Sequence, residues 1–278
     1  MKAYQILLCA VGLTAAGARA DAQTLYGATS SGQGELYILN PATGGVVQDV
    51  GALNDSGAVN YSVTGLAFDP LTGALYGSTG GHSGTDLLTI NPANGLVTVV
   101  GSFNVGTATM TDLAFDHSGN LYGIGSSGGA NLYSINLSTG QATEIGASGV
   151  SFTEGGGLAI GGSGIFYGAP IPGDYGTYNP TTGVYTQITA PATPAGAGSS
   201  YGALAFDGSV LYGDNLVAGG SGVTHLVTID AASGNVTDIG PSVTHLDAIA
   251  FTSVPEPGTM SLLLGAGAMA LLAFKRRR

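Results

Sequence analysis

The chain has 278 residues, of which 49 are glycine and one is cysteine, and its formal net charge is −11. Only 8% of the residues are charged, and the six basic ones are Lys2, Arg19, Lys275 and Arg276 to Arg278. Residues 21–253 therefore contain no Lys and no Arg, although they hold 16 of the 17 acidic residues. A domain without fixed cations lacks the groups that bind phosphates, so this composition excludes nucleic acids and nucleotides as ligands.

The N-terminal segment has the pattern of a secretory signal peptide. Met1-Lys2 is followed by an apolar run over residues 6–16 and by an A-x-A site at Ala18 and Ala20. This order predicts residues 1–20 as the signal peptide, cut after Ala20 or alternatively after Ala22. Cys9 would be removed with it, which leaves the mature protein without a disulfide or a thiolate nucleophile.

The next feature is a unit that recurs from Leu25 to Phe251. In residues 65–101 it contains four short apolar runs, GLAF, ALYG, LLTI and LVTVV, separated by turn sequences such as Asn91-Pro92-Ala93-Asn94-Gly95. Each run is too short for a helix and rich in β-branched or aromatic residues. The unit therefore predicts a four-stranded antiparallel meander.

The signs of this unit each occur five times. The first-strand sign, Leu-Ala-Phe, Leu-Ala-Ile or Ile-Ala-Phe, starts at residues 66, 113, 158, 204 and 249, with spacings of 47, 45, 46 and 45 residues. The second-strand sign, Leu-Tyr-Gly or Phe-Tyr-Gly, starts at residues 25, 75, 121, 166 and 211. A period near 45 residues with four strands per unit is typical of a β-propeller.

The two ends of the repeat region predict how the ring closes. The first unit starts at its second strand, Leu25, and the last unit is followed by an additional first strand, Ala248 to Phe251. Pairing the two would remove open sheet edges. We expect residues 21–253 to form a propeller of five four-stranded blades: 25–51 with 248–251, 65–101, 112–146, 157–190 and 203–240. In general form the blades resemble NHL-type and lyase-type propellers, which implies that the GLAFD strand is innermost.

The C-terminal segment has three consecutive parts. Val254-Pro255-Glu256-Pro257 is followed by an apolar run, Met260 to Phe274, and by the basic tail Lys275, Arg276, Arg277 and Arg278. A helix over residues 260–274 would be about 22 Å long, which makes a short transmembrane anchor beside a hydrocarbon core of about 30 Å. The positive-inside rule places the tail in the cytoplasm and the propeller on the outer side.

These three parts resemble the PEP-CTERM sorting signal of Gram-negative bacteria over residues 254–278. The resemblance implies export through the inner membrane, transient anchoring by the helix, and removal of the tail by an exosortase-type enzyme near Pro255 to Pro257. It further implies a place at the cell surface or outside the cell, alongside exopolysaccharide, biofilm or other surface proteins.

Few residues suggest chemistry in the repeat region. Asp112, Glu154, Asp247 and His245 lie at or just before innermost strands, where Ca²⁺ could bind to the carboxylates. The competing interpretation is that these four residues are polar side chains at strand entries that do not contact one another. We expect Asp69, Asp116 and Asp207 to form Asx turns, and His82, His117, His225 and His245 to lie in solvated loops, since they share no metal-ligand spacing.

The tyrosines of the second-strand sign are expected to pack between blades, whereas Tyr61, Tyr175 and Tyr201 are candidates for exposed sugar stacking. Three functions remain open. The first is a non-catalytic exported surface or matrix propeller without a cofactor. The second is a secreted enzyme of the lyase or lactonase type, and the third is a Ca²⁺-dependent carbohydrate binder. Fold alone does not decide among these functions. The sequence contains no evident set of catalytic residues, and it therefore favours the first function.

Overall fold

The computed structural model describes residues 23–31, 33–80, 85–106, 109–126, 128–152, 155–190, 198–216 and 222–252. Several predicted features lie outside these ranges: the signal peptide with Ala18 and Ala20, the sorting motif 254–257, the helix 260–274, the basic tail 275–278, and the side chains of His82 and Glu154. Chain contacts set apart Gln23–Ser253 as one unit, and the fold is described for this unit alone.

The described residues form twenty β-strands in five four-stranded sheets and contain no helix, as the repeat predicted. Within each sheet, the strands run in the order β20-β1-β2-β3 (blade 1), β4 to β7 (blade 2), β8 to β11 (blade 3), β12 to β15 (blade 4) and β16 to β19 (blade 5). All pairings are antiparallel between neighbours.

The strand bounds are β1 Leu25–Thr29, β2 Glu35–Leu39, β3 Val46–Ala52, β4 Val63–Phe68, β5 Leu75–Thr79, β6 Asp86–Ile90, β7 Val97–Ser102, β8 Met110–Phe115, β9 Leu121–Gly125, β10 Asn131–Ile135, β11 Ala142–Gly146, β12 Gly157–Ile160, β13 Phe166–Ala169, β14 Tyr175–Tyr178, β15 Tyr185–Thr189, β16 Ser200–Asp207, β17 Val210–Leu216, β18 Val223–Ile229, β19 Val236–Thr244 and β20 Leu246–Phe251.

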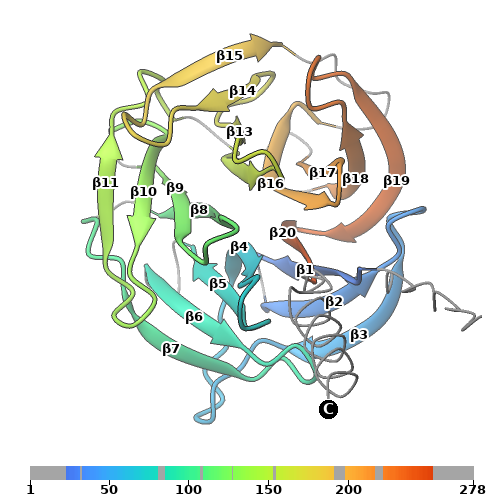
Figure 1. Ribbon diagram of the computed structural model, residues 1–278. Helices are drawn as coiled ribbons and strands as arrows, with labels where there is room; N and C mark the ends of the chain where they lie inside the picture. The colour runs from blue at the N-terminus through green and yellow to red at the C-terminus, as the bar shows by residue number, and fades with distance from the viewer. Residues whose placement is uncertain are drawn as a thin grey trace, which may run out of the picture. The chain divides into compact units, whose positions relative to one another are not determined.

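The sheets stand around a common centre, with β20, β4, β8, β12 and β16 innermost (Figure 1). The hydrophobic core is divided into five clusters, and each cluster draws its buried side chains from two neighbouring blades. Since one sheet cannot bury both of its faces alone, the ring supplies the partner for every face.

The ring closes by pairing the two ends of the repeat region, which confirms the predicted shared blade. The innermost strand β20 runs antiparallel to β1, with Leu25 opposite Phe251. Two hydrogen bonds of 2.9 Å continue this pairing beyond the strands. The Thr24 N–H donates to Thr252 Oγ1, and the Thr252 N–H donates to the Thr24 carbonyl. The edge that β1 would otherwise expose is therefore covered.

The tyrosines of the second-strand sign lie between blades, as expected, and each contacts a phenylalanine of the next blade. They are half-buried, not fully buried. Blade 4 has Ile160 at the usual phenylalanine position, and Phe166 takes over the contact from the neighbouring strand. The five pairs, with centroid distances of 4.8–5.6 Å, are Tyr26–Phe68, Tyr76–Phe115, Tyr122–Phe166, Tyr167–Phe206 and Tyr212–Phe251.

A second repeated contact joins the outer hairpins to the preceding blade. The hairpin glycines Gly44, Gly95, Gly140, Gly183 and Gly234 have φ between 71° and 76°, which disfavours other residues. At Gly140 and Gly183 an added Cβ would also lie only 2.2 Å and 2.4 Å from a backbone oxygen of the preceding blade. Glycine is therefore required here by conformation and by space.

No helix long and apolar enough to span a membrane is found in the described part of the chain.

Candidate functional site

The first candidate region is the group of aspartates where the innermost strands begin. Asp112 on β8 is fully buried, and four small residues occupy its position in the other blades, namely Gly65, Gly157, Ala203 and Ala248. Asp112 Oδ1 accepts a hydrogen bond from its neighbour Leu113 N (2.8 Å). Asp112 Oδ2 accepts bonds from Leu158 N on β12 (2.7 Å) and Leu204 N on β16 (3.0 Å). One carboxylate thus connects three blades near the centre of the ring.

The environment of Asp112 affects its titration in two opposing ways. Burial raises the pKa of Asp112 well above the usual Asp range, and the nearby Asp214 carboxylate adds to this rise. The three backbone N–H bonds stabilise the anion and oppose the rise. A carboxylate whose two oxygens already accept three N–H bonds is a structural acceptor at this position.

Asp214 is a functional candidate that the sequence reasoning missed. It lies on β17 directly after the Leu-Tyr-Gly sign and is fully buried. Its Oδ1 accepts a bond from Ala203 N (2.6 Å), whereas its Oδ2 is buried without a hydrogen-bond partner. The available signal was the residue type, because the other blades have Ala28, Ser78, Ile124 and Ala169 at this position.

The described structure contains two of the three predicted calcium ligands, Asp112 and Asp247. Asp112 is bound to backbone N–H groups, Asp247 is half-buried on β20, and Glu154 lies outside the described residues. Among the described side chains, no group of three or more His, Cys, Asp or Glu is arranged to hold a metal ion. Calcium binding stays a prediction.

The remaining predicted aspartates and histidines have local roles. Asp69 and Asp116 form the expected Asx turns, accepting bonds from Leu71 N (2.8 Å) and Ser118 N (2.9 Å). Asp207 instead ends β16 opposite Val210 at a two-residue hairpin.

His225 does not lie in a loop as expected. It lies on β18 and pairs with Asp238 of β19 over 3.0 Å, because cross-strand neighbours on one face of a sheet are close. His117 is exposed, and His245 is the single residue between β19 and β20, with φ at 61°.

The prediction of exposed sugar-stacking tyrosines at Tyr61, Tyr175 and Tyr201 is wrong, because all three are buried. Tyr61 donates its hydroxyl to Asp55 Oδ2 (3.1 Å), and Tyr175 donates to the Ala231 carbonyl of the next blade (3.1 Å). Burial raises the pKa of Tyr201 to about 12. Tyr175 and Tyr201 lie on strands β14 and β16 and Tyr61 lies just before β4, and all three aromatic rings belong to the core clusters between blades.

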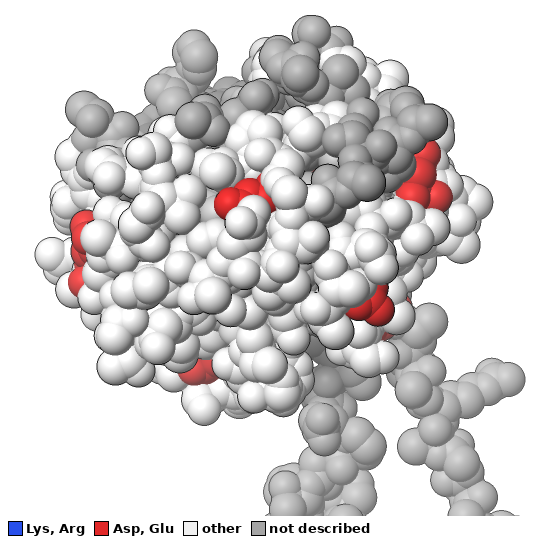
Figure 2. Space-filling model, turned by 90° about the horizontal axis from the view of Figure 1, so that it is seen from above, with Lys and Arg blue, Asp and Glu red and all other residues white. Residues whose placement is uncertain are grey.

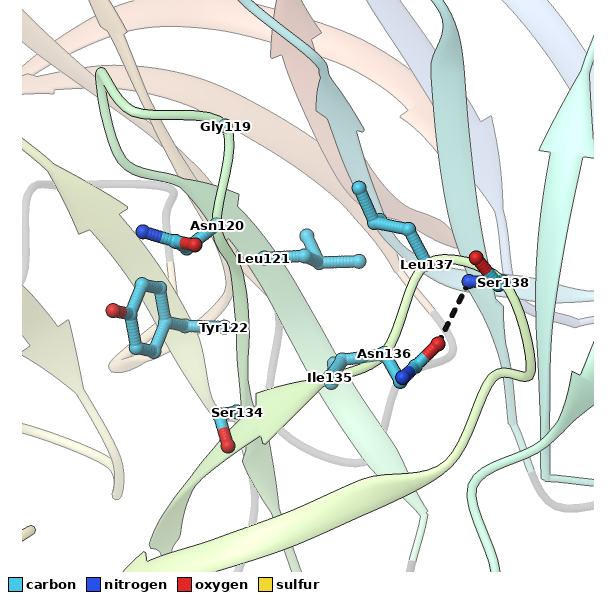
Figure 3. A pocket seen from close by; sticks show the side chains of 9 residues that line it. All are labelled: Gly119, Asn120, Leu121, Tyr122, Ser134, Ile135, Asn136, Leu137 and Ser138. Carbon is cyan, nitrogen blue, oxygen red and sulfur yellow. Dashed lines mark hydrogen bonds between the residues drawn. The ribbon is translucent and has the colours of Figure 1, made fainter.

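A second candidate region is a surface hollow of about 480 Å³ on blade 3, lined by Gly119, Asn120, Leu121, Tyr122, Ser134, Ile135, Asn136, Leu137 and Ser138 (Figure 3). Beside the aliphatic side chains of Leu121, Ile135 and Leu137, the lining contains amides, hydroxyls and one tyrosine ring, and no charged side chain. These groups both donate and accept hydrogen bonds, as sugar hydroxyls do.

The polar side chains of this hollow are held in place by neighbouring bonds. Asn120 Nδ2 donates to Asp116 Oδ2 (2.8 Å), and Asn136 Oδ1 accepts from Ser138 N (2.9 Å). Tyr122 packs edge-on against Phe166 at 4.8 Å. Burial and the Asp116 carboxylate raise the pKa of Tyr122, so its hydroxyl is neutral at physiological pH. The hollow is therefore preorganised.

The charge on the surface is of one sign. The face in Figure 2 carries separate Asp and Glu side chains and no Lys or Arg, in agreement with the absence of both residue types from residues 21–253. Such a surface repels polyanions at low ionic strength.

Comparisons with known proteins agree with this architecture. The chain belongs to the family described as a repeat of unknown function, DUF6923, whose model matches residues 10–163 and 55–206. Residues 253–278 match the PEP-CTERM protein-sorting motif. No curated protein matches the chain at a significant level.

Solved structures show the fold at low sequence identity. A chain of a nidogen/laminin complex is 14% identical, with a TM-score of 0.53 over 84% of this chain and 98% of that chain. A protein of unknown function from Bacteroides caccae is 14% identical, with a TM-score of 0.51 over 84% and 99%. A glutaminyl cyclase from Myxococcus xanthus is 19% identical, with a TM-score of 0.44 over 66% of this chain and 71% of that chain.

Proposed function

We propose that this protein is exported, cut by an exosortase at its PEP-CTERM signal, and then acts at the cell surface or in the extracellular matrix as a non-catalytic propeller that binds neutral polysaccharide. The observation that carries the proposal is the match of residues 253–278 to the sorting motif, directly after the strand that closes the ring. The propeller is complete before the signal begins, so removal of the tail leaves the described fold intact.

The ligand class follows from charge and from the lining of the blade 3 hollow. A domain without Lys or Arg has no fixed cation of its own to neutralise uronate or phosphate groups. The hollow instead offers two asparagine amides held by hydrogen bonds, together with serine hydroxyls and the Tyr122 ring. Its volume lies in the range of roughly 300–1,000 Å³ that is typical of small-ligand sites. These features support a neutral sugar as ligand.

Processing can be tested by mass spectrometry of protein recovered from the native host. We expect an N-terminus near Asp21 or Gln23 and a C-terminus between Val254 and Pro257. A variant with Pro255, Glu256 and Pro257 all replaced by Ala should keep its tail and stay in the membrane fraction. Recovery of the basic tail on mature wild-type protein from the extracellular fraction would contradict exosortase sorting.

Sugar binding can be tested by calorimetry on the processed protein with maltohexaose, cellohexaose and laminarihexaose as neutral probes and polygalacturonate as the acidic probe. The double variant Asn120→Ala, Tyr122→Phe should bind its neutral probe about thirtyfold more weakly, since two hydrogen bonds are lost and each is worth roughly 1 kcal/mol. Blade 2 has Ala74 at the position of Asn120, so this change is compatible with the fold.

The matched control is Tyr76→Phe in blade 2, where the ring packs on Phe115 as Tyr122 packs on Phe166. This control should leave affinity unchanged. Equal losses in both blades, binding of the acidic probe alone, or no binding of any neutral probe would each refute a neutral-sugar site in this hollow, while leaving the sorting proposal to its own test.

A further inference from the structure

We infer that the hollow on blade 3 is one part of a longer sugar-binding site, and that Leu71 of blade 2 forms a second part, the Leu71 subsite, where the C–H face of a neighbouring sugar unit packs. The ligand is then an extended neutral oligosaccharide, and its affinity depends on its length. The inference rests on the proposed function, because it specifies the ligand of the same site and adds a residue outside the lining of the hollow.

The first observation is that Leu71 is more exposed than folding requires. It lies in the turn between β4 and β5 and is 68% exposed, more than any other large hydrophobic residue in the described part of the chain. It is the third residue after the first-strand sign, and the other blades that have this turn carry serine there, namely Ser118, Ser163 and Ser209. The turn therefore forms without a leucine.

Hydrogen bonds of the turn hold the backbone of Leu71 in place. The Leu71 N–H donates to Asp69 Oδ1 over 2.8 Å, and Thr72 Oγ1 donates to Asp69 Oδ2 over 2.6 Å. The Gly73 N–H donates to the Asp69 carbonyl over 2.8 Å. Because this backbone is already ordered, a ligand that covers the Leu71 side chain loses little free energy to ordering the turn.

Leu71 adjoins the hollow through Gly119, which is one of the lining residues. A Cβ added to Gly119 would lie 2.7 Å from Leu71 Cδ1 and 3.2 Å from Leu71 Cγ. The φ angle of Gly119 is 81°, so conformation and space both disfavour a side chain at this position. The Leu71 side chain thus occupies the space beside Gly119 and extends the surface of the hollow toward blade 2.

The hollow has two chemically different sides. Leu121, Ile135 and Leu137 contribute to the core cluster between blades 2 and 3, whereas Tyr122 packs against the cluster between blades 3 and 4. Successive residues of a strand point to opposite faces, and Figure 3 shows Leu121 and Tyr122 directed away from each other. Since Leu71 comes from blade 2, it extends the aliphatic side.

A neutral sugar matches such a surface, because its hydroxyl groups lie around the edge of each ring and its C–H groups lie on the faces. The amides of Asn120 and Asn136 can bond the hydroxyls, and C–H groups that cover Leu71 remove apolar surface from water. An acidic unit would instead lie near Asp69 and Asp116, and residues 21–253 hold no Lys or Arg to offset its charge. One unit therefore occupies the hollow and the next unit contacts Leu71.

The experiment compares Leu71→Ser with the wild type, both as processed protein, on a short and a long probe of one linkage. The probes are cellobiose and cellohexaose, maltose and maltohexaose, and laminaribiose and laminarihexaose, and the pair whose hexaose binds the wild type is used. Leu71→Ser should bind the hexaose about tenfold more weakly by calorimetry, because part of the burial of a leucine side chain is lost. It should bind the disaccharide with unchanged affinity in an NMR titration. Its melting temperature should equal that of the wild type, since serine fills this position in three blades.

The matched control is Leu96→Gln. Leu96 lies in the outer hairpin of the same blade and is 44% exposed, and blade 3 has Gln141 at that position. This hairpin contacts blade 1, on the side of blade 2 opposite to blade 3, because a Cβ added to Gly95 would lie 2.8 Å from the Ala52 carbonyl oxygen. Leu96→Gln removes an exposed leucine away from the hollow, so it should keep the wild-type affinity for both probes.

Equal hexaose affinities of Leu71→Ser and the wild type would overturn the Leu71 subsite alone, since the Asn120→Ala, Tyr122→Phe variant tests the hollow separately. Equal losses for the disaccharide and the hexaose would also overturn it, because Leu71 would then only support the hollow. A wild-type dimer that becomes a monomer in Leu71→Ser, measured by analytical ultracentrifugation, would show that a second copy of the chain covers this residue in place of a sugar. If no neutral hexaose bound the wild type, the proposed function and the Leu71 subsite would both be refuted.

Discussion

A chain truncated after Thr244 should fail to form a stable ring, whereas a chain that ends at Ser253 should fold like the full protein. The truncation removes β20, whose Leu246, Ile249 and Phe251 side chains are at most 6% exposed. Burial of such a side chain contributes about 1.5–3 kcal/mol. The loss of three is therefore comparable with the total stability of a domain, roughly 5–15 kcal/mol.

Thermal unfolding followed by circular dichroism checks this prediction. The shortened chain should show no cooperative transition near that of the longer one, and it should associate, because the inner edge of β1 would be unpaired. Adding a synthetic peptide of residues 245–253 should restore part of the transition. If both truncated chains melted at the same temperature, β20 would not be the strand that holds the ring together.

The fold could be predicted from the sequence because the residues that determine it are local and repeated in every blade. Each blade carries its own strand signs, and the turn glycines recur at the position where all five φ values lie near 73°. The closing strand could also be predicted, because the first unit lacks its first strand and begins at Leu25, while an additional first strand ending at Phe251 follows the last unit. A repeat displays its register several times, so one irregular blade does not hide it.

Blade 4 departs from the other blades at its innermost strand. Its first strand ends in Ile160, not in phenylalanine, and the aromatic contact comes from Phe166 on the next strand. The space between two blades has to be filled, but more than one strand can fill it. The packing of the interface was therefore predictable, whereas the identity of its side chain was not.

The candidate site was harder to predict from the sequence, because its contacts join residues that are far apart in the chain. Asp112 and Asp247 were recognised as carboxylates at strand entries, and metal binding was the chemistry suggested by their type. The bonds of Asp112 run to residues 46 and 92 positions later. Asp214 is on a different strand of its blade. Only the closed ring shows that backbone N–H groups from three blades meet one carboxylate.

Replacement of Asp112 should produce the second large effect. In Asp112→Ala, the N–H groups of Leu158 and Leu204 lose their acceptor inside the ring. A buried group left without a hydrogen bond costs about 1–3 kcal/mol, although removal of a buried charge returns part of that cost. We expect a net loss of roughly 2–5 kcal/mol, which for a domain of this size lowers the melting temperature by about 4–20 °C.

The decisive variant is Asp112→Gly, because it copies Gly65 and Gly157 at the same position in two other blades. It removes the carboxylate together with its Cβ and leaves the donors of Leu113, Leu158 and Leu204 directed at an open space near the ring centre. Three converging N–H groups are an anion site, and a ligand that binds only the folded state raises its stability. Added formate should therefore raise the melting temperature of Asp112→Gly by several degrees more than chloride at equal ionic strength, and should leave the wild type unchanged. If formate had no such effect while the variant was destabilised, the role of Asp112 would be to fill space and not to accept the three hydrogen bonds.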